Sequence, residues 1–310
     1  MRVLITGAEG FVGNHLTKLL LEKEHEVFAG VHKSTSKVSG VQNVTCDILD
    51  RKRLKAVMQD IKPEGIIHLA AQSKVKVAWE NPSYTVMTNT VGSINLVQEA
   101  AEVVPQVKVL TIGSSEEYGL AAKQGEPLSE EAVCLPQNPY SSSKLALGQI
   151  VLQLARRDRL NIIHVRPFNH FGPGQQEGYV MSDFAAQVAR IEKGLIEPVI
   201  RVGDLSTRRD FTFVCDVVSA YALLLEGDLS CGIYNICSGI PREIKAVLDF
   251  MLSRARVPVQ VKVDAERFRP SEVPVFVGSA EKIKNLTGWQ PEQDFEEAIV
   301  ETLDWWREQV

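Results

Sequence analysis

A tyrosine and a lysine four residues apart are the residues of this sequence whose spacing most clearly suggests chemistry. Tyr140 and Lys144 lie in the stretch of residues 138–144, and on a helix they would share one face, one turn apart. A close ammonium group favours a phenolate over the phenol. A tyrosine tuned in this way can exchange a proton with an alcohol or a carbonyl near neutral pH. The same pair occurs by chance on ordinary helices, so its meaning depends on the rest of the chain.

A glycine-rich stretch near the N-terminus predicts a dinucleotide-binding turn. Residues 3–5 form a short apolar run typical of a buried parallel strand, and the glycine-rich residues 7–13 follow it. The glycines allow a tight turn, and the N–H groups of the next helix can hold a pyrophosphate. The spacing is G-x-x-G-x-x-G instead of the usual G-x-G-x-x-G, and a plain glycine turn is the alternative. The predicted cofactor contacts here are Gly7, Gly10, Phe11, Val12 and Gly13.

The end of the second predicted strand, residues 26–31, bears on the choice of cofactor. Sites that prefer NAD usually place Asp or Glu at this point to bind the ribose hydroxyls. Here His32, Lys33 and Ser34 follow the strand, with no acid among them. We therefore expect His32 and Lys33 to meet the 2′-phosphate of NADP, giving a modest preference for NADPH with NADH also accepted. A solvated basic loop is the alternative.

Strands and helices alternate along the first half of the chain. Further strands are expected at residues 43–46, 65–69, 107–112 and 161–165, and helices at residues 51–60, at residues 89–103 and around Tyr140. This pattern predicts an α/β fold with a doubly wound parallel sheet, which binds ligands at the carboxyl ends of its strands. Three of those ends carry Asp47 with Ile48, Leu69 with the small residues Ala70 and Ala71, and the polar cluster of residues 113–119. Asp47 is placed to meet the adenine end of a dinucleotide.

The alternation weakens after about residue 166, so the second half is expected to differ in character. We expect a Rossmann domain at residues 1–168 and a smaller C-terminal substrate-binding lobe at residues 169–310, with some segments returning to the first domain. Arginines gather in this half, at Arg208 and Arg209 and again at Arg267 and Arg269. Because arginine makes forked contacts with phosphate, we interpret these groups as a site for a small anion. Surface salt bridges are the alternative.

Composition excludes several classes of function. The chain has 310 residues, of which 45% are hydrophobic, and a formal net charge of -5, which argues against nucleic acid as the main partner. No apolar run approaches the ~20 residues that a membrane span needs, and the N-terminus lacks a signal-peptide pattern. The five cysteines are scattered and odd in number, as in a cytoplasmic protein with reduced thiols. No metal site is expected from the spacing of the histidines and cysteines.

Taken together, these motifs resemble the extended short-chain dehydrogenase/reductase family. The resemblance rests on the order of the Gly7 loop, Ala70 with Ala71, Ser114, and Tyr140 with Lys144, and it covers the whole chain. Within that family the chain is similar to the enzymes that act on GDP-6-deoxyhexoses. The stretches that carry this likeness are residues 114–119, 166–170, 209–211 and 269–273.

The resemblance implies an NAD(P)H-dependent enzyme that reduces the C4 keto group of a GDP-4-keto-6-deoxyhexose. Tyr140 would give its proton to the C4 oxygen, and Ser114 would hydrogen-bond the same oxygen. Lys144 would bind the nicotinamide ribose and lower the pKa of the tyrosine. A non-catalytic dinucleotide sensor is the contrasting hypothesis, but such a protein would be free to lose these three residues.

GDP-mannose 4,6-dehydratase activity is the nearest alternative that the resemblance leaves open, together with related nucleotide-sugar epimerases. Glu116 lies at a position that resembles the acid/base glutamate of the dehydratases. Two departures favour the reductase. Only residues 32–46 separate the second strand from Asp47, where the dehydratases carry a longer, arginine-bearing insertion, and residues 174–179 differ from their arginine-rich segment.

The resemblance also implies binding sets and an assembly. The cofactor set adds Asn89, as part of a proton path behind Lys144, and Arg166. Asn169, Arg209 and Arg269 would hold the GDP diphosphate, and Glu272 would accept from the guanosine ribose. The remaining implied substrate contacts are Ser73, Ser115, Glu116, Val180 and Arg201. Family members commonly pair through two helices each, so a homodimer is expected.

Overall fold

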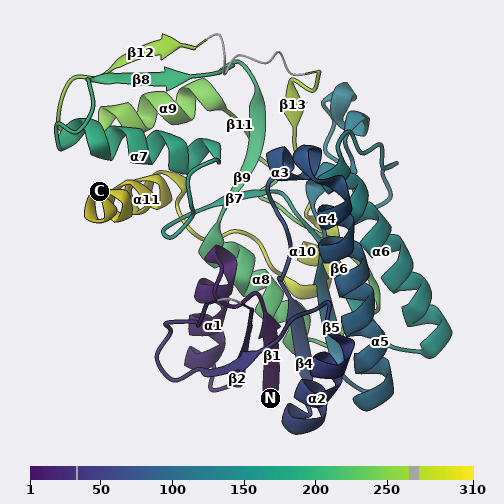
Figure 1. The fold of residues 1–310 in the computed structure, drawn as a ribbon. Helices are drawn as coiled ribbons and strands as arrows, with labels where there is room; N and C mark the ends of the chain where they lie inside the picture. Colours follow the sequence, from purple (N-terminus) through teal and green to yellow (C-terminus); the bar gives the residue numbers. More distant parts are fainter. Residues whose placement is uncertain (33, 265–271) are drawn as a thin grey trace.

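A seven-stranded parallel sheet forms the centre of the protein within residues 1–32, 34–264 and 272–310, which the computed structural model describes (Figure 1). Its strands follow the order β10-β6-β5-β4-β1-β2-β3. In chain order they are β1 (Arg2–Thr6), β2 (Glu26–Val31), β3 (Gln42–Thr45), β4 (Gly65–His68), β5 (Lys108–Ile112), β6 (Asn161–Pro167) and β10 (Gly232–Ile236). The order reverses between β1 and β4, which is the switch point of a doubly wound sheet. The predicted α/β fold class is confirmed.

Helices cover both faces of this sheet because its strands are apolar on both sides. The core on one face includes Val3 and Ile5 of β1 and is closed by α1 (Phe11–Glu22) and α8 (Val214–Glu226). The core on the other face includes Leu4 of the same strand. The helices that close it are α2 (Arg51–Ile61), α5 (Ser93–Val103) and α6 (Pro139–Asp158).

The second half of the chain builds a smaller part beyond the carboxyl ends of the sheet strands (Figure 1). Its helices are α7 (Val180–Glu192), α9 (Ile244–Ser253) and α11 (Phe295–Gln309), and β8 (Val199–Val202) pairs with β12 (Gln260–Val263). A small sheet joins β7 (Asn169–Phe171), β9 (Arg208–Phe213), β11 (Pro241–Glu243) and β13 (Val275–Phe276). Because β10 and α8 return to the main sheet, the two parts are interleaved in sequence, and a domain boundary at residue 168 stays a prediction.

Short helices occupy the connections near the carboxyl edge. They are α3 (Val75–Glu80), α4 (Pro82–Val86), the π-helix η1 (Met87–Gly92), η2 (Ser115–Glu117), η3 (Leu120–Gln124) and α10 (Glu281–Thr287). The helix expected at residues 89–103 therefore consists of two segments, because η1 widens the turn before α5 begins. Within the described ranges, no helix is long and apolar enough to cross a membrane.

Candidate active site

Tyr140 lies in the first turn of α6, and the local sequence fixes where that helix begins. The Asn138 side chain accepts a hydrogen bond from the Ser141 backbone N–H at 2.9 Å, and the Ser141 hydroxyl accepts one from the Asn138 N–H at 3.2 Å. Pro139 occupies the first helical position, where its missing N–H has no intrahelical partner to lose. This capping box directs Tyr140 toward the residues that follow β5.

Ser114 follows β5, and its side chain lies close enough to the Tyr140 phenol to lower the pKa of that residue. The Ser114 hydroxyl also accepts from the Glu116 backbone N–H at 3.1 Å, which begins η2. Both side chains therefore meet at the carboxyl edge of the sheet, where a doubly wound fold binds its ligands. The structure brings together the hydroxyl pair that the sequence predicted.

The ionisation of Tyr140 differs from the sequence-based expectation. Burial raises the pKa of Tyr140 well above its ordinary value, and the Ser114 side chain lowers it by less. The Lys144 ammonium does not offset this burial, because its Nζ donates to the Ile112 carbonyl at 2.6 Å. Burial in turn lowers the pKa of Lys144 to about 8. Burial thus outweighs the effect expected of Lys144, and the phenol is the stable form of Tyr140 at neutral pH in this structure.

A buried carboxylate supports the Ser114 backbone from below. Glu117 accepts from the Ser114 N–H at 2.9 Å, from Arg166 at 2.8 Å, and lies 3.2 Å from His164. Burial opposes the charge on Glu117, but His164, Arg166 and the Ser114 N–H together lower its pKa below the ordinary value. The Arg166 guanidinium also packs over the Tyr118 ring at 4.8 Å. These contacts give Arg166 a structural place, and its contact with a cofactor stays a prediction.

Asn89 lies fully buried behind the Tyr140 helix. Its side-chain amide donates to the Gln72 carbonyl and to the Ser143 hydroxyl, each at 3.0 Å, and accepts from the Gln72 N–H at 2.8 Å. The Asn89 carbonyl accepts from the Ser93 hydroxyl, which also contacts the buried His68 at 2.7 Å. A continuous polar chain thus links β4, η1 and α6, as a proton path behind Lys144 would require.

The glycine loop has the close contacts that a dinucleotide site needs. Gly7 has φ of +71°, and a Cβ at this position would lie 2.8 Å from the Ala70 N atom. A Cβ on Gly13 would lie 2.5 Å from the Gly7 carbonyl oxygen. Gly10 caps α1, and within the described chain no side chain caps its first turn. This uncapped helix start and its glycine cradle fit the pyrophosphate of NAD(P).

Phe11 begins α1 and also connects the glycine loop to the second half of the chain. Its ring stacks on His170 of β7, with centroids 6.1 Å apart and planes 12° apart. Gln175 donates to the His170 carbonyl at 2.8 Å, and its own Oε1 is buried with no hydrogen-bond partner among the described residues. Val12 and Leu69 are partly buried and pack against the core that α1 and α8 close on one face of the sheet.

A carboxylate from the glycine loop lies at the end of β2. Glu9 reaches out of the glycine loop, and its Oε1 accepts from the His32 backbone N–H at 3.2 Å. The His32 imidazole lies 3.6 Å from the Asp47 carboxylate, whose other oxygen accepts from the Leu49 N–H at 2.9 Å. Lys33 lies outside the described residues. Ile48 is buried against Gly92 of η1.

The predicted anion-binding residues lie on the small sheet of the second half. The Arg209 Nη1 donates to the Val273 carbonyl at 3.2 Å, and burial lowers the pKa of its guanidinium while the nearby Glu116 raises it. Asn169 donates to the Asp210 carbonyl at 3.4 Å and is otherwise exposed. Arg209 thus lies close enough to Glu116 for the carboxylate to stabilise the charged guanidinium. Arg269 lies outside the described residues.

Other predicted substrate contacts are more scattered. Glu272 pairs with Lys123 at 2.7 Å, and Arg201 pairs with Glu197 at 2.7 Å on the exposed surface. Val180 is exposed at the start of α7, and Ser115 is buried in η2. The contacts of these four residues do not bring them together at Tyr140, and their roles in substrate binding stay predictions.

Tyr179 is a site residue that sequence reasoning missed. Its hydroxyl lies 3.1 Å from the Ser73 hydroxyl, which joins the loop before α7 to the loop after β4. It is also close enough to Tyr140 to raise the pKa of that residue. Its position just before a helix carries no local signal, and only the approach of the two halves of the chain brings it here.

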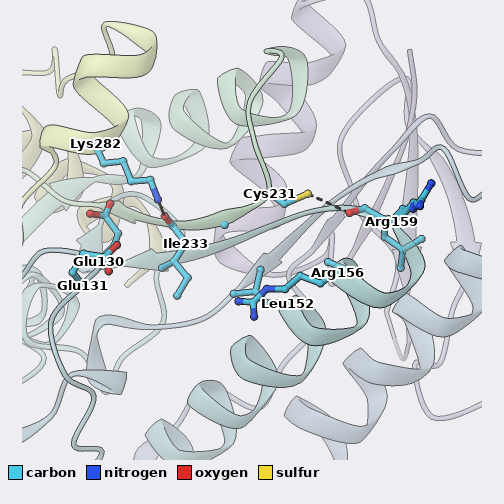
Figure 2. A pocket seen from close by; sticks show the side chains of 11 residues that line it. Glu130, Glu131, Leu152, Arg156, Arg159, Cys231, Ile233 and Lys282 are labelled. Carbon is cyan, nitrogen blue, oxygen red and sulfur yellow. Dashed lines mark hydrogen bonds between the residues drawn. The ribbon is translucent and has the colours of Figure 1, made fainter.

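A cavity of about 540 Å³ lies elsewhere on the molecule, beside the C-terminus of α6 (Figure 2). Arg156, Arg159 and Cys231 line it near the amino ends of β6 and β10, and Lys282 donates to the Ile233 carbonyl at 2.7 Å. Because ligands of doubly wound sheets bind at the carboxyl edge, we place the active site at Tyr140 and not in this cavity. Among the described residues, no group of three or more His, Cys, Asp or Glu side chains could hold a metal ion.

Comparison with known proteins agrees with this geometry. Residues 4–302 match the family described as GDP-mannose 4,6 dehydratase. The chain belongs to this family. It is 33% identical to a GDP-6-deoxy-D-mannose reductase of Pseudomonas aeruginosa over 309 residues, covering 100% of this chain and 98% of that protein. The resemblance to extended short-chain dehydrogenases/reductases is confirmed.

Solved structures extend the agreement to the whole fold. RMD from Pseudomonas aeruginosa, solved with NADPH, has a TM-score of 0.87 and 31% identity, covering 100% of this chain and 99% of that one. UDP-glucose 4-epimerase from Thermus thermophilus, solved with NAD, has a TM-score of 0.87 and 30% identity, covering 100% of both chains. The chain is thus a member of a family of GDP-sugar oxidoreductases and dehydratases that bind NAD(P).

Proposed function

We propose that this protein reduces the C4 keto group of a GDP-4-keto-6-deoxyhexose, converting GDP-4-dehydro-6-deoxy-D-mannose to GDP-D-rhamnose with NAD(P)H. The observation that carries the proposal is the placement of the Tyr140 phenol beside the Ser114 side chain at the carboxyl edge of the sheet. A carbonyl that accepts hydride needs a proton at its oxygen, and a phenol kept neutral by burial is a donor for that step.

Each of three side chains has a separate task in this proposal. Tyr140 gives its proton to the C4 oxygen of the sugar. Ser114 donates a hydrogen bond to the same oxygen and stabilises the charge that develops there. Lys144 holds the nicotinamide ribose and, as an ammonium close to the phenol, stabilises the tyrosinate left after proton transfer. The buried polar chain at Asn89 then returns a proton from outside the site.

The cofactor residues are chosen from the contacts of the glycine loop. Gly7, Gly10 and Gly13 give the pyrophosphate access to the start of α1, while Ala70 and Ala71 keep the neighbouring edge open. Asp47 and Ile48 border the adenine end. When bound, the reduced nicotinamide supplies the hydride, which no side chain of the protein can provide.

The substrate residues come from the second half of the chain. Arg209 lies on β9 beside Glu116, and Asn169 begins β7, the strand paired with β9. A guanidinium and an amide on paired strands suit the two phosphates of a GDP sugar. Arg269 belongs to the same proposal by sequence, and Glu272 would accept from the guanosine ribose hydroxyls.

GDP-mannose 4,6-dehydratase activity is a second candidate, favoured by one observation. Glu116 is exposed, lies close enough to raise the pKa of Tyr140, and accepts from the Asn138 side chain at 3.3 Å. A carboxylate so placed could take the C5 proton that dehydration requires. The short connection from His32 to β3 favours the reductase, because it leaves no room for the longer insertion that the dehydratases carry there.

We also propose a homodimer. Five large hydrophobic side chains are exposed on the adjacent helices α3, α4 and η1: Val75, Trp79, Tyr84, Val86 and Met87. An apolar surface of this kind supports pairing with a second copy. Light scattering at several protein concentrations tests it, and a concentration-independent monomer mass rejects it.

The proposed reaction is tested by adding GDP-4-keto-6-deoxymannose to the protein with NADH or NADPH. The proposal predicts loss of one reduced cofactor for each sugar, and a product heavier by two hydrogens in mass spectrometry. The matched control is the Tyr140→Phe variant under the same conditions. Unchanged sugar and cofactor with the wild-type protein would reject the proposal.

A further inference from the structure

The carboxylate of Glu9 lies at the end of β2, where adenosine ribose is bound in doubly wound folds. Its position is set by the 3.2 Å hydrogen bond from the His32 N–H, the first residue after β2. The second oxygen of this carboxylate is buried and, within the described residues, has no hydrogen-bond partner. The structure thus places a carboxylate charge at the end of β2, and only one of its two oxygens receives a hydrogen bond from the described residues.

We infer that Glu9 determines cofactor preference and makes the protein favour NADH over NADPH. This inference rests on the proposed cofactor site. The expected strand-end acid is missing from the sequence after β2, and the glycine loop supplies one in its place. A carboxylate accepts from the 2′- and 3′-hydroxyls of NADH, whereas the 2′-phosphate of NADPH carries about −1.5 to −2 charges and is repelled.

Two other charged groups that the structure describes at this point, His32 and Arg53, already have partners. The His32 imidazole lies 3.6 Å from the Asp47 carboxylate, so the negative charge of Asp47 offsets a positive charge on His32. Arg53 lies on α2, and its Nε donates to the Thr45 carbonyl at 2.8 Å. Two carboxylates therefore meet the ribose end. The inference is thus opposite to the modest preference for NADPH expected from the sequence at residues 32–33, and Lys33 lies outside the described residues.

The inference is tested by cofactor binding without any sugar. Dissociation constants of NADH and NADPH are measured by nicotinamide fluorescence for the wild type, Glu9→Gln and Glu9→Thr. The control is Glu22→Gln, which removes one exposed charge from the C-terminal end of α1, the helix that follows the glycine loop. A unit charge repelled at ~4 Å lowers affinity ~5-fold even at the dielectric constant of bulk water, and by more in a partly solvated site.

The wild type is expected to bind NADH about tenfold tighter than NADPH, from the same charge argument. Glu9→Gln and Glu9→Thr should lower this ratio at least about fivefold, chiefly through tighter binding of NADPH, and Glu22→Gln should leave it unchanged. Equal or tighter binding of NADPH by the wild type overturns the inference, whether or not the variants fold. An unchanged ratio in folded Glu9 variants overturns it as well. Since no sugar is present, a failed reductase assay leaves this result intact.

Discussion

The Nζ of Lys144 donates to the backbone carbonyl of Ile112 at 2.6 Å, and not to Tyr140. Ile112 ends β5, so this bond ties α6 to the strand that also carries Ser114. It keeps the two hydroxyls of the site in register while burial lowers the pKa of the amine to about 8. The protonation state of Lys144 therefore changes at a pH of about 8.

The pH dependence of reduction follows from these two groups. Because burial raises the pKa of Tyr140, the phenol stays protonated through neutral and mildly alkaline pH. Lys144 is an ammonium below its pKa of about 8 and a neutral amine above it. We expect kcat for reduction to fall as the pH rises through about 8, because the positive charge beside the tyrosinate is lost. A kcat that increases through that range would contradict this role of Lys144.

Replacement of Tyr140 separates proton transfer from binding. Tyr140→Phe removes only the phenol oxygen, and we expect turnover to fall ~10²- to 10⁴-fold. Cofactor dissociation constants should stay near the wild-type values. Tyr234→Phe is the matched control, since the Tyr234 hydroxyl bonds the Ser230 carbonyl at 3.0 Å, away from the site. Near-normal turnover in Tyr140→Phe would remove this residue from the mechanism.

Arg209→Ala tests the assignment of the substrate lobe. Loss of a charged contact to a diphosphate costs about 1.5–3 kcal/mol, so we expect a correspondingly higher KM for the GDP sugar. The dissociation constant of the reduced cofactor should change little. Arg157→Ala is the control, because Arg157 pairs with Asp158 at the exposed end of α6. If the variant loses affinity for the cofactor alone, the assignment of Arg209 to the substrate-binding site is contradicted.

Glu117 is expected to matter for stability and for the position of Ser114. Glu117→Gln leaves the buried Arg166 without its charge partner, at a cost of about 3–5 kcal/mol. Because the pKa of Glu117 is lowered by folding, its contribution is present above its unfolded pKa and is lost as pH falls through the folded value. Urea unfolding at neutral and acidic pH measures both effects. Equal stability of variant and wild type at neutral pH would contradict the ion-pair account.

The sequence predicted six of the seven sheet strands, because most of them are short apolar runs with a clear end, and it missed β10 (Gly232–Ile236). The second strand lies at residues 26–31 in both prediction and structure. The π-helix Met87–Gly92 carries no such local signal, so the helix at residues 89–103 was predicted without its break.

The features of the site that the sequence could not predict depend on residues that are distant in the chain and meet only in the folded protein. Glu9 and His32 meet across the switch between loop and strand, and Ser73 meets Tyr179 across the two halves of the chain. The raised pKa of Tyr140 could not be predicted, because the spacing of Tyr140 and Lys144 shows their proximity but not their burial. Motif residues were thus predictable, whereas their electrostatics depended on the folded surroundings.

Reduction and dehydration are distinguished most directly by where the hydride comes from. The protein is incubated with GDP-mannose and a catalytic amount of oxidised cofactor, and in parallel with GDP-4-keto-6-deoxymannose and deuterated NADH. We predict little change in GDP-mannose and a 6-deoxy product that carries deuterium at C4, formed in step with NADH loss. Rapid accumulation of a 4-keto-6-deoxy sugar from GDP-mannose, with no reductant consumed, would contradict the account and make Glu116 the base of a dehydratase.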